Sequence, residues 1–463
     1  MKKYIGTRAF YKMVLLVAVP IMIQNGITNF VGMLDNIMVG QVGTNQMSGV
    51  AIINQMMLVF NISIFGAISG AGIFASQYYG CKDYEGVRNA FRYKMIICVL
   101  LTVSAVLLFL IKGDALISLY LHESNDVMAN AETLKYAREY LWIMLLGLLP
   151  FAVEQVYSGT LRETSETILP MKAGIAAVLV NLVLNYLLIF GKFGLPVLGV
   201  NGAAIATVIS RYVQAFIVIR WTHAHLGKAD GNPEHFMAGV YRCFKVPGYL
   251  FSRITIKAAP LLLNEVLWSL GMAALMQAYS MRGLDVVAGM NISNTIMNVF
   301  NVVYMAMGNA IAIIIGQHLG AGKIEQAKED SVKLMFFSVI SCAAIAAGMV
   351  LFSGIFPQIY NTTDKVKKLA EGFICVAAVT MPLCAFVNAS YFILRSGGKT
   401  GITFLFDSVF VWTVIIPVAI ILSRFTDIQA VWMYFICQSI EIIKCIIGFI
   451  LVKKGVWIQN ITK

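Results

Sequence analysis

The sequence predicts an all-α polytopic membrane protein with 12 transmembrane helices in two six-helix bundles. Of its 463 residues, 59% are hydrophobic and only 13% are charged, and the mean hydropathy is +0.79. Soluble domains carry about 25% charged residues, so much of this surface must contact lipid. Apolar runs extend from end to end, and the first lacks a small-residue cleavage site, as is typical of a retained span rather than a signal peptide.

Each predicted span is a run of about 20 apolar residues, and turn and charge signals such as GCKDYEG and FPQIYNTTDKVKK separate the spans. The first six are expected near residues 13–39, 47–74, 93–111, 137–158, 169–190 and 199–220. The other six are expected near residues 255–280, 288–316, 333–353, 372–394, 402–422 and 429–452. The predicted domains are an N-terminal bundle at 1–221, a linker at 222–254 and a C-terminal bundle at 255–463.

Lysine and arginine predict the orientation in the membrane. The net charge is +12, and with both termini on one side that side holds about 24 of the 35 basic residues. The positive-inside rule then places both termini and the linker in the cytoplasm, in a multi-pass protein of the inner (plasma) membrane. Because the loops explain this charge and no basic tract is interleaved with aromatic residues, we expect no nucleic-acid partner.

The two halves carry an internal repeat at a shift of 240 residues. The matched pairs are Pro20 and Pro260, Gly43 and Gly283, Gly49 and Gly289, Asn54 and Asn294, Gln77 and Gln317, and Gly80 and Gly320. Chance similarity between apolar helices would match Leu and Ile rather than Gly, Asn and Gln. Six spans return the chain to its starting side, so the halves share one orientation, with a pseudo-two-fold axis along the membrane normal and a cavity between two bundles. This architecture is typical of a transporter.

Asp35 is a lone carboxylate in an apolar helix. It shares one helical stripe with Gln24 and Thr28, and Asn25 lies on the adjacent stripe, so one face of this helix is polar over several turns. Lipid would not tolerate such a face, and a charge at mid-bilayer costs roughly 2.5–3.5 kcal/mol. We therefore predict a protonatable or cation-binding carboxylate in a water-accessible pocket. The alternative is an interfacial Asp that accepts hydrogen bonds from the helix end or the following loop.

Acids in other spans are further candidates. Glu265 and Asp407 lie about a third of the way into their predicted helices from the cytoplasmic side. Either acid could hold a coupling ion or attract a cationic substrate, and the alternative for each is an inter-helix hydrogen bond. Glu154 has a similar depth and is a candidate for the substrate cavity. Glu441 precedes Lys444 by one turn, which favours an internal ion pair.

Asparagines form stripes on three more predicted helices. These candidates are Asn54, Asn181, Asn185, Asn291, Asn294 and Asn298. An interhelical hydrogen bond contributes only about 0.6 kcal/mol, and one Asn per contact usually suffices. A run along one helix face therefore favours lining of the substrate cavity, and interhelical packing is the alternative.

Several motifs carry a family resemblance. The stretch AVPIMIQNGITNFVGMLDNIMVGQVG (18–43) resembles the first helix of the multidrug and toxic compound extrusion (MATE) family, with an early Pro, a helix-borne Asp and V-G-x-x-G. SQYYGCKDYEGVRN and GQHLGAGKIEQAKE resemble the family's loops after helices 2 and 8, and ILRSGGKT resembles its helix 10–11 loop. VNLVLNYLLIFG, followed by LGVNGAAIATVISR, resembles its helix 5 to helix 6 stretch.

The resemblance covers nearly the whole chain and implies a secondary antiporter. Such a protein uses inward H⁺ or Na⁺ to export bulky, lipophilic and often cationic compounds by alternating access. Two features depart from the family. The loop LRETSET lacks the glycines of its second copy, and Glu265 lies five residues after Pro260, about one turn earlier than the corresponding acid in part of the family.

Other function classes fit the sequence poorly. It contains no Walker sequence, HExxH or GxSxG, and its eight cysteines stand singly. We expect no enzyme activity, no cofactor beyond H⁺ or Na⁺ as coupling ion, and no metal beyond Na⁺ at the coupling residues. The expected partners are small-molecule substrates, chiefly organic cations, and the lipid bilayer, with the protein as a monomer. The alternatives are a lipid-linked glycan flippase, which would need a cationic central cavity, or an intramembrane channel or enzyme.

Overall fold

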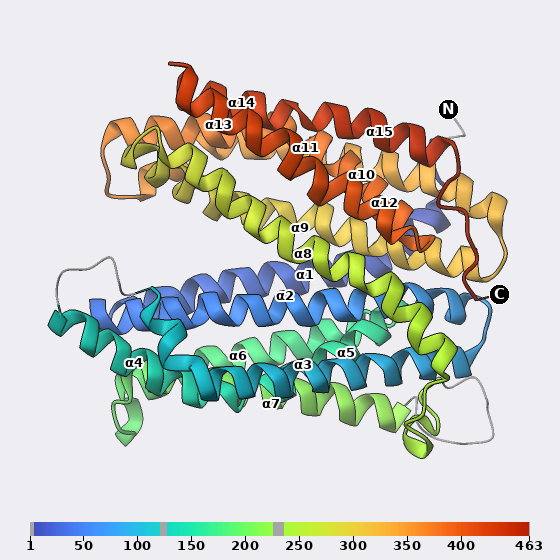
Figure 1. Cartoon of the computed structure of the whole chain (residues 1–463), viewed down its shortest axis with the longest axis horizontal. Coiled ribbons are helices and arrows are strands. Elements are labelled where there is room, and N and C mark those ends of the chain that lie inside the picture. Colours follow the sequence, from blue (N-terminus) through green and yellow to red (C-terminus); the bar gives the residue numbers. More distant parts are fainter. Residues whose placement is uncertain (1–3, 121–126, 226–235, 463) are drawn as a thin grey trace. The chain divides into compact units, whose positions relative to one another are not determined.

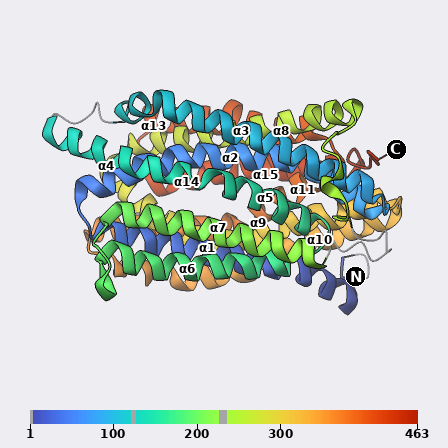
Figure 2. The ribbon, with the colours of Figure 1, turned by 90° about the horizontal axis from the view of Figure 1, so that it is seen from below.

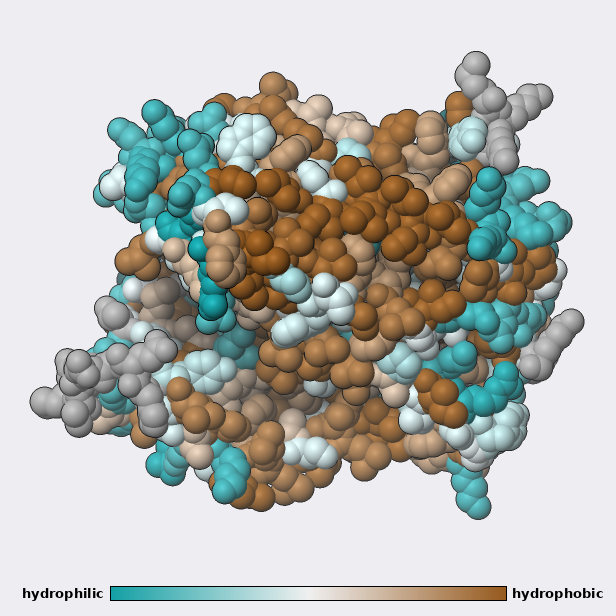
Figure 3. All heavy atoms as spheres, turned by 45° about the horizontal axis from the view of Figure 1, so that its top comes forward, coloured by the Kyte–Doolittle hydropathy of each residue, from teal (hydrophilic) through white to brown (hydrophobic). Residues whose placement is uncertain are grey.

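The computed structural model describes residues 4–120, 127–225 and 236–462, and every regular element within these ranges is a helix (Figure 1). Eleven helical stretches within these ranges are long and apolar enough to cross a membrane, and two of them, Thr400–Phe425 and Ala430–Lys453, consist of several shorter elements. A bent helix pair provides a twelfth span when counted as one. The predicted fold class, an all-α polytopic membrane protein, is confirmed. Apolar side chains dominate the middle of the face in Figure 3, and hydrophilic ones gather toward its ends.

The helices follow the predicted spans closely. The first half contains α1 (Arg8–Gly40), α2 (Thr44–Gly80), α3 (Tyr84–Ser118), α4 (Val127–Leu145), α5 (Leu148–Glu163), α6 (Ile168–Phe190) and α7 (Gly199–His225). The second half contains α8 (Gly248–Ser280), α9 (Leu284–Gly320), α10 (Ile324–Ser353), α11 (Asp364–Ser396), α12 (Thr400–Phe404), α13 (Ile416–Phe425), α14 (Ala430–Ser439) and α15 (Glu441–Lys453). Two π-helical stretches, Leu405–Val409 (η4) and Val411–Ile415 (η5), connect α12 to α13.

The internal repeat reappears in the helix boundaries. Adding 240 to both bounds of α1 gives the bounds of α8, and the same shift converts α2 into α9. The helices α3 and α10 also begin 240 residues apart, at Tyr84 and Ile324. Further along, α6 and α12 begin 232 residues apart, at Ile168 and Thr400. The repeat is therefore structural, and the second half is shorter between its third and fifth spans.

The fourth span was predicted as one continuous helix, but in the structure it is broken. It consists of α4 and α5, which meet at an angle of 47°. At the break, the N–H of Gly147 donates to the carbonyl of Met144 at 3.0 Å, which tightens the turn. Pro150 follows in α5 and lacks the N–H that a continuous helix would use. Arg211 of α7 donates to the carbonyl of Gly147 at 3.3 Å, and the same carbonyl accepts from the backbone N of Phe151 at 3.3 Å.

The chain divides into two compact units. We call the first the C-terminal unit; it comprises Met1–Met22, Ser76–Asp83 and Ile256–Lys463. The N-terminal unit comprises Ile23–Ala75 and Tyr84–Thr255. In the N-terminal unit α6 packs along α7 (Figure 2), and in the C-terminal unit α11 packs against α9 and α10.

The segment between the repeated halves is helical at both ends. Helix α7 extends to His225 and α8 begins at Gly248, while residues 226–235 lie outside the described part of the chain. After them, Phe236, Met237 and Val240 are buried in the N-terminal unit. The guanidinium of Arg92 fixes this stretch by donating to the carbonyl of Val240 at 2.9 Å.

Candidate functional site

Amide groups of α6 surround the carboxylate of Asp35. The Nδ2 of Asn185 donates to Oδ1 of Asp35 at 2.6 Å. Asn181, one turn earlier on α6, donates to both carboxylate oxygens, at 3.0 and 3.1 Å, in the amide orientation that satisfies its hydrogen bonds. Within the described ranges, none of the ion pairs involves Asp35. The charge of this carboxylate is therefore met by amide dipoles rather than by a cation.

The walls of this site come from α4, α6 and α7. Asn185 is only 1% exposed and Asn181 is 6% exposed, whereas Asp35 stays partly exposed. Thr207 of α7 places its Oγ1 3.3 Å from the amide of Asn181. Tyr140 of α4 is buried within electrostatic reach of Asp35. The sequence did not single out Thr207 or Tyr140 as site residues, although Thr207 shares a helical stripe with Ser210 and Gln214.

The remaining polar residues of α1 extend this site along the helix. Gln24 packs against α6, where a Cβ added to Gly174 would lie 3.3 Å from its Cγ. Thr28 is exposed and its Oγ1 donates to the carbonyl of Gln24 at 2.8 Å. Asn25 is half-buried. The predicted Gln24, Thr28 and Asp35 stripe thus runs beside α6, with Gln24 and Asp35 both in contact with that helix.

In the second half, Asp407 is held by a cation. The Nζ of Lys444 lies 3.1 Å from its Oδ1, and the Nδ2 of Asn264 donates to its Oδ2 at 3.1 Å. Lys444 is 3% exposed and also lies 3.4 Å from Oε2 of Glu441. The expected ion pair between Glu441 and Lys444 is therefore present, but the same ammonium group also contacts Asp407.

The backbone around Asp407 widens into a π-helical turn. This residue lies in η4, and Ser408 after it is fully buried. Asn264 of α8 accepts hydrogen bonds on its Oδ1 from the backbone N of Ser408 at 3.3 Å and from its Oγ at 2.7 Å. Wide turns of this type are frequent at functional sites. Asn264 therefore ties the turn to α8 while it contacts Asp407 through its nitrogen.

Glu265 adjoins this cluster from α8. Its charged neighbours are Arg395 of α11 and Asp407. Tyr391, also on α11, accepts a hydrogen bond from Nδ2 of Asn264 at 3.4 Å. We call the five charged groups the C-terminal charge cluster: Glu265, Asp407, Glu441, Arg395 and Lys444. Helices α8, α11 and α15 and the π-helical turn bring them together.

The asparagine rows lie on open faces of α2 and α9. The exposed members are Asn54, Asn291, Asn294 and Asn298. Asn54 and Asn294 occupy equivalent positions of the repeat. An amide side chain on a lipid-facing helix would leave its polar groups without water. These rows therefore favour faces in contact with water.

Glu154 lies in a different environment from Asp35. It is 2% exposed on α5, and it accepts hydrogen bonds from Oγ of Ser158 at 2.5 Å and Nε2 of Gln155 at 2.8 Å. Further along α5, Glu163 forms an ion pair with the fully buried Lys94 of α3. The structure thus places Glu154 in a buried hydrogen-bonded cluster.

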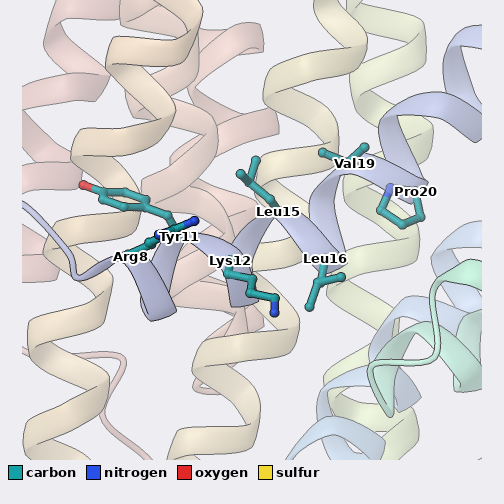
Figure 4. Close-up of a pocket in the computed structure, with 7 residues that line it drawn as sticks. All are labelled: Arg8, Tyr11, Lys12, Leu15, Leu16, Val19 and Pro20. Carbon is teal, nitrogen blue, oxygen red and sulfur yellow. The ribbon is translucent and has the colours of Figure 1, made fainter.

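A surface groove lies along the first turns of α1 and has a volume of about 550 Å³ (Figure 4). Its lining consists of Arg8, Tyr11, Lys12, Leu15, Leu16, Val19 and Pro20. The two charged groups of this lining are cations, so the groove offers an organic cation no favourable electrostatic partner. Among the residues that the structure describes, His, Cys, Asp and Glu form no group of three that could hold a metal ion.

A family model matches the chain in two segments. The MatE model matches residues 20–187 and 260–421, two segments that begin at the equivalent Pro20 and Pro260. The chain belongs to the MatE family. This family comprises multidrug efflux transporters, so the predicted MATE membership is confirmed. Asp35, Asn181 and Asn185 all fall within the first matched segment.

Two curated proteins and one solved structure are similar to this chain over most of its length. The chain is 24% identical over 423 residues to the probable multidrug resistance protein NorM of Thermotoga maritima, covering 88% of this chain and 84% of that protein. It is 25% identical over 388 residues to the multidrug resistance protein MdtK of Yersinia pseudotuberculosis, covering 82% of this chain and 79% of that protein. An outward-facing structure of a multidrug resistance MATE family transporter matches with a TM-score of 0.85 at 19% identity, covering 96% of this chain and 95% of that one.

Proposed function

We propose that this MatE family protein is a secondary active antiporter that exports lipophilic, often cationic compounds in exchange for inward H⁺ or Na⁺. The observation that carries the proposal is the carboxylate of Asp35, which amides of α6 hold and which forms no ion pair with any residue in the described part of the chain. In this proposal the protein works by alternating access, lies in the plasma membrane as a monomer, and has both termini in the cytoplasm.

The Asp35 site suits an exchangeable cation. Amide N–H groups stabilise the ionised carboxylate, while poor solvation favours its neutral or cation-bound form. These opposing effects let the group change state when access to water changes. Hard cations such as Na⁺ take oxygen ligands. The carboxylate of Asp35, the amide oxygens of Asn181 and Asn185 and the hydroxyl of Thr207 supply such atoms, so the residues suit either H⁺ or Na⁺.

The C-terminal charge cluster is a second candidate for coupling. Its three acids, Glu265, Asp407 and Glu441, face two cations, Arg395 and Lys444. With all five ionised, one negative charge is left over. One proton, one Na⁺ or one monovalent organic cation would neutralise it. We propose that Glu265 carries this exchangeable charge, because Asp407 and Glu441 already contact Lys444.

The asparagine rows are candidates for contact with the substrate in each unit. Exposed amides on α2 and α9 would hydrogen-bond to water or to polar groups of a substrate, and apolar side chains between them would pack against its rings. This combination suits substrates of varied shape. A lipid-linked glycan flippase fits less well. The buried ammonium groups of Lys94 and Lys444 are each bound to an acid, which leaves neither free for a pyrophosphate.

Efflux from proteoliposomes tests the proposal. Imposed H⁺ or Na⁺ gradients should each be tried alone, with a fluorescent organic cation as substrate. We expect one gradient to drive efflux by the wild type and Asp35→Asn to lose this response. Asp427→Asn makes the same change at an exposed loop residue and should retain wild-type transport. Gradient-driven efflux by Asp35→Asn at the wild-type rate would contradict the coupling role.

A further inference from the structure

The chain after α15 forms a segment that packs across the C-terminal unit. We call residues 457–462 the tail segment. Trp457 is 1% exposed, and its Nε1 donates to the carbonyl of Val452 at 3.1 Å. A Cβ added to Gly397 would overlap the carbonyl of Trp457. Ile461 is also buried. The tail segment is therefore seated in the fold rather than lying loosely on its surface.

The side chain of Gln77, in the last turn of α2, binds the tail segment. It is completely buried, and its Oε1 accepts a hydrogen bond from the backbone N of Ile461 at 2.8 Å. Its Nε2 donates to the carbonyl of Gln459 at 3.2 Å and to the carbonyl of Ser396 at 2.9 Å. One amide thus binds backbone groups of the tail segment and of the end of α11. A hydrophobic side chain of the same size could make none of these bonds.

The same turn of α2 crosses the end of α9 with no side chain between the two backbones. A Cβ at Gly80 would overlap the carbonyl of Gln317, and a Cβ at Gly320 would overlap the carbonyl of Gln77. These four residues are equivalent pairs of the repeat, 240 positions apart. The tail segment bridges the crossing, since Nδ2 of Asn460 donates to the carbonyl of Gly320 at 3.3 Å while Ile461 binds Gln77.

We infer that Gln77 is a positioning residue of the transport cycle and that the tail segment is a releasable latch across the crossing of α2 and α9. The inference rests on the proposed alternating access. In such a cycle, helices from the two repeated halves must separate at one end before the transporter can open there. A backbone crossing without side chains closes this end tightly. The hydrogen bonds between Gln77 and the tail segment must break before it opens.

A reversible cross-link tests whether the latch must open. The Sγ of Cys81 lies 3.9 Å from Oγ1 of Thr462, so Thr462→Cys would place two thiols together. Oxygen with copper phenanthroline as catalyst would join them, each thiol losing one electron and one proton to the oxidant. The variant should carry Cys243→Ser, because Cys243 is another exposed cysteine. We expect gradient-driven efflux to fall at least tenfold on oxidation and to return on reduction.

The matched control is the same variant with Cys81→Ser, which cannot form this cross-link and should transport equally well with and without oxidant. Full transport by a protein shown to be cross-linked would overturn the latch. That result would leave the proposed antiport intact, because the effect of Asp35→Asn on gradient-driven efflux is measured separately. If the antiport proposal is wrong, efflux by the wild-type protein would instead be the same with and without either ion gradient.

A second experiment follows opening without transport. Ser76 is 4% exposed and faces α9, where a Cβ added to Gly316 would lie 3.0 Å away. Ser76→Cys therefore makes a thiol that reacts with a membrane-permeant maleimide only when the crossing opens. Ile461→Pro removes the N–H that binds Gln77, and Ile461→Val keeps it.

We expect Ile461→Pro and Gln77→Met each to raise the rate of maleimide labelling at least threefold, and Ile461→Val to leave it unchanged. The proteins should carry Cys81→Ser and Cys243→Ser, and labelling should be located by peptide mass. A merely structural role for Gln77 would change protein yield and unfolding temperature but not labelling of folded protein. Equal labelling rates in folded variants would overturn the inference.

Discussion

Asp35 and Asp407 are both carboxylates inside predicted spans, yet their partners differ in kind. Asp35 accepts hydrogen bonds from the amides of Asn181 and Asn185. Asp407 contacts the ammonium of Lys444 as well as the amide of Asn264. A carboxylate bound only by amides has no positive charge beside it, whereas one bound by a buried ammonium already has a cation partner. The two sites therefore suit different tasks, exchange at Asp35 and structural support at Asp407.

The largest effect on stability is expected from Lys444→Met. This change leaves Asp407 and Glu441 buried without their cation, and removing one partner of a buried ion pair destabilises a protein by about 3–5 kcal/mol. Thermal unfolding in detergent measures the loss. Adding Asp407→Asn should restore much of it, because one of the two uncompensated charges is then gone. Equal stability of Lys444→Met and wild type would contradict the support role of the pair.

Asn185→Lys would turn the first site into a copy of the second. An ammonium beside Asp35 should neutralise the carboxylate permanently, so gradient-driven efflux should fall by roughly 100-fold, or about 2.7 kcal/mol of activation free energy. The protein should still fold, because the new cation has a partner. Asn185→Asp is the matched comparison, because it places an acid rather than a cation beside Asp35. If Asn185→Lys transports normally, Asp35 does not need to exchange a cation.

Asn264→Leu tests the hydrogen bonds that hold the π-helical turn. The substitution keeps the volume but leaves the backbone N of Ser408 without its acceptor and Asp407 without one donor. Loss of a partner at a buried polar group costs about 1–3 kcal/mol. Unfolding temperature measures this cost, and Asn264→Asp should recover part of it through its remaining acceptor atoms. A neutral effect of the Leu variant would show that the turn needs no support from α8.

The smallest effect is expected at Gly174. The Cβ that Gly174→Ala adds would lie 3.3 Å from Cγ of Gln24, so the side chain of Gln24 must shift by a few tenths of an ångström. We expect a change in unfolding free energy within about 1 kcal/mol, because the helix gain from Ala offsets part of the crowding. Gly26→Ala is the control, since nothing lies within 4 Å of its added Cβ. A stability gain at Gly174 equal to that at Gly26 would mean that Gln24 adapts freely.

The sequence predicted the long-range order of the fold better than its local irregularities. Apolar runs located the spans because each must cross the same thickness of lipid. The 240-residue repeat anticipated the boundaries of α8 and α9. The break between α4 and α5 was missed, because Gly147 and Pro150 also occur within continuous membrane helices. Hydrophobicity alone does not separate these cases.

The residues of the Asp35 site that the sequence predicted are those that belong to polar rows. Gln24, Asp35, Asn181 and Asn185 each belong to a polar row with helical spacing. The pairing of Asp407 with Lys444 joins positions 37 residues apart on different helices, and no periodic pattern encodes such a pair. The π-helical turn at Asp407 was missed as well, since apolar residues fill a π-helical turn as readily as an α-helical one.

The crossing at Gly80 and Gly320 has the form of an isologous interface within a single chain. Each half contributes the same glycine and the same glutamine, and each glycine meets the glutamine of the other half. In a symmetric dimer, two identical subunits meet in this reciprocal way. At this crossing, a single six-span half would therefore already carry both residues needed to meet a second copy of itself. Fusion of two such halves would need no new contact at this point, only the tail segment that makes the pair asymmetric.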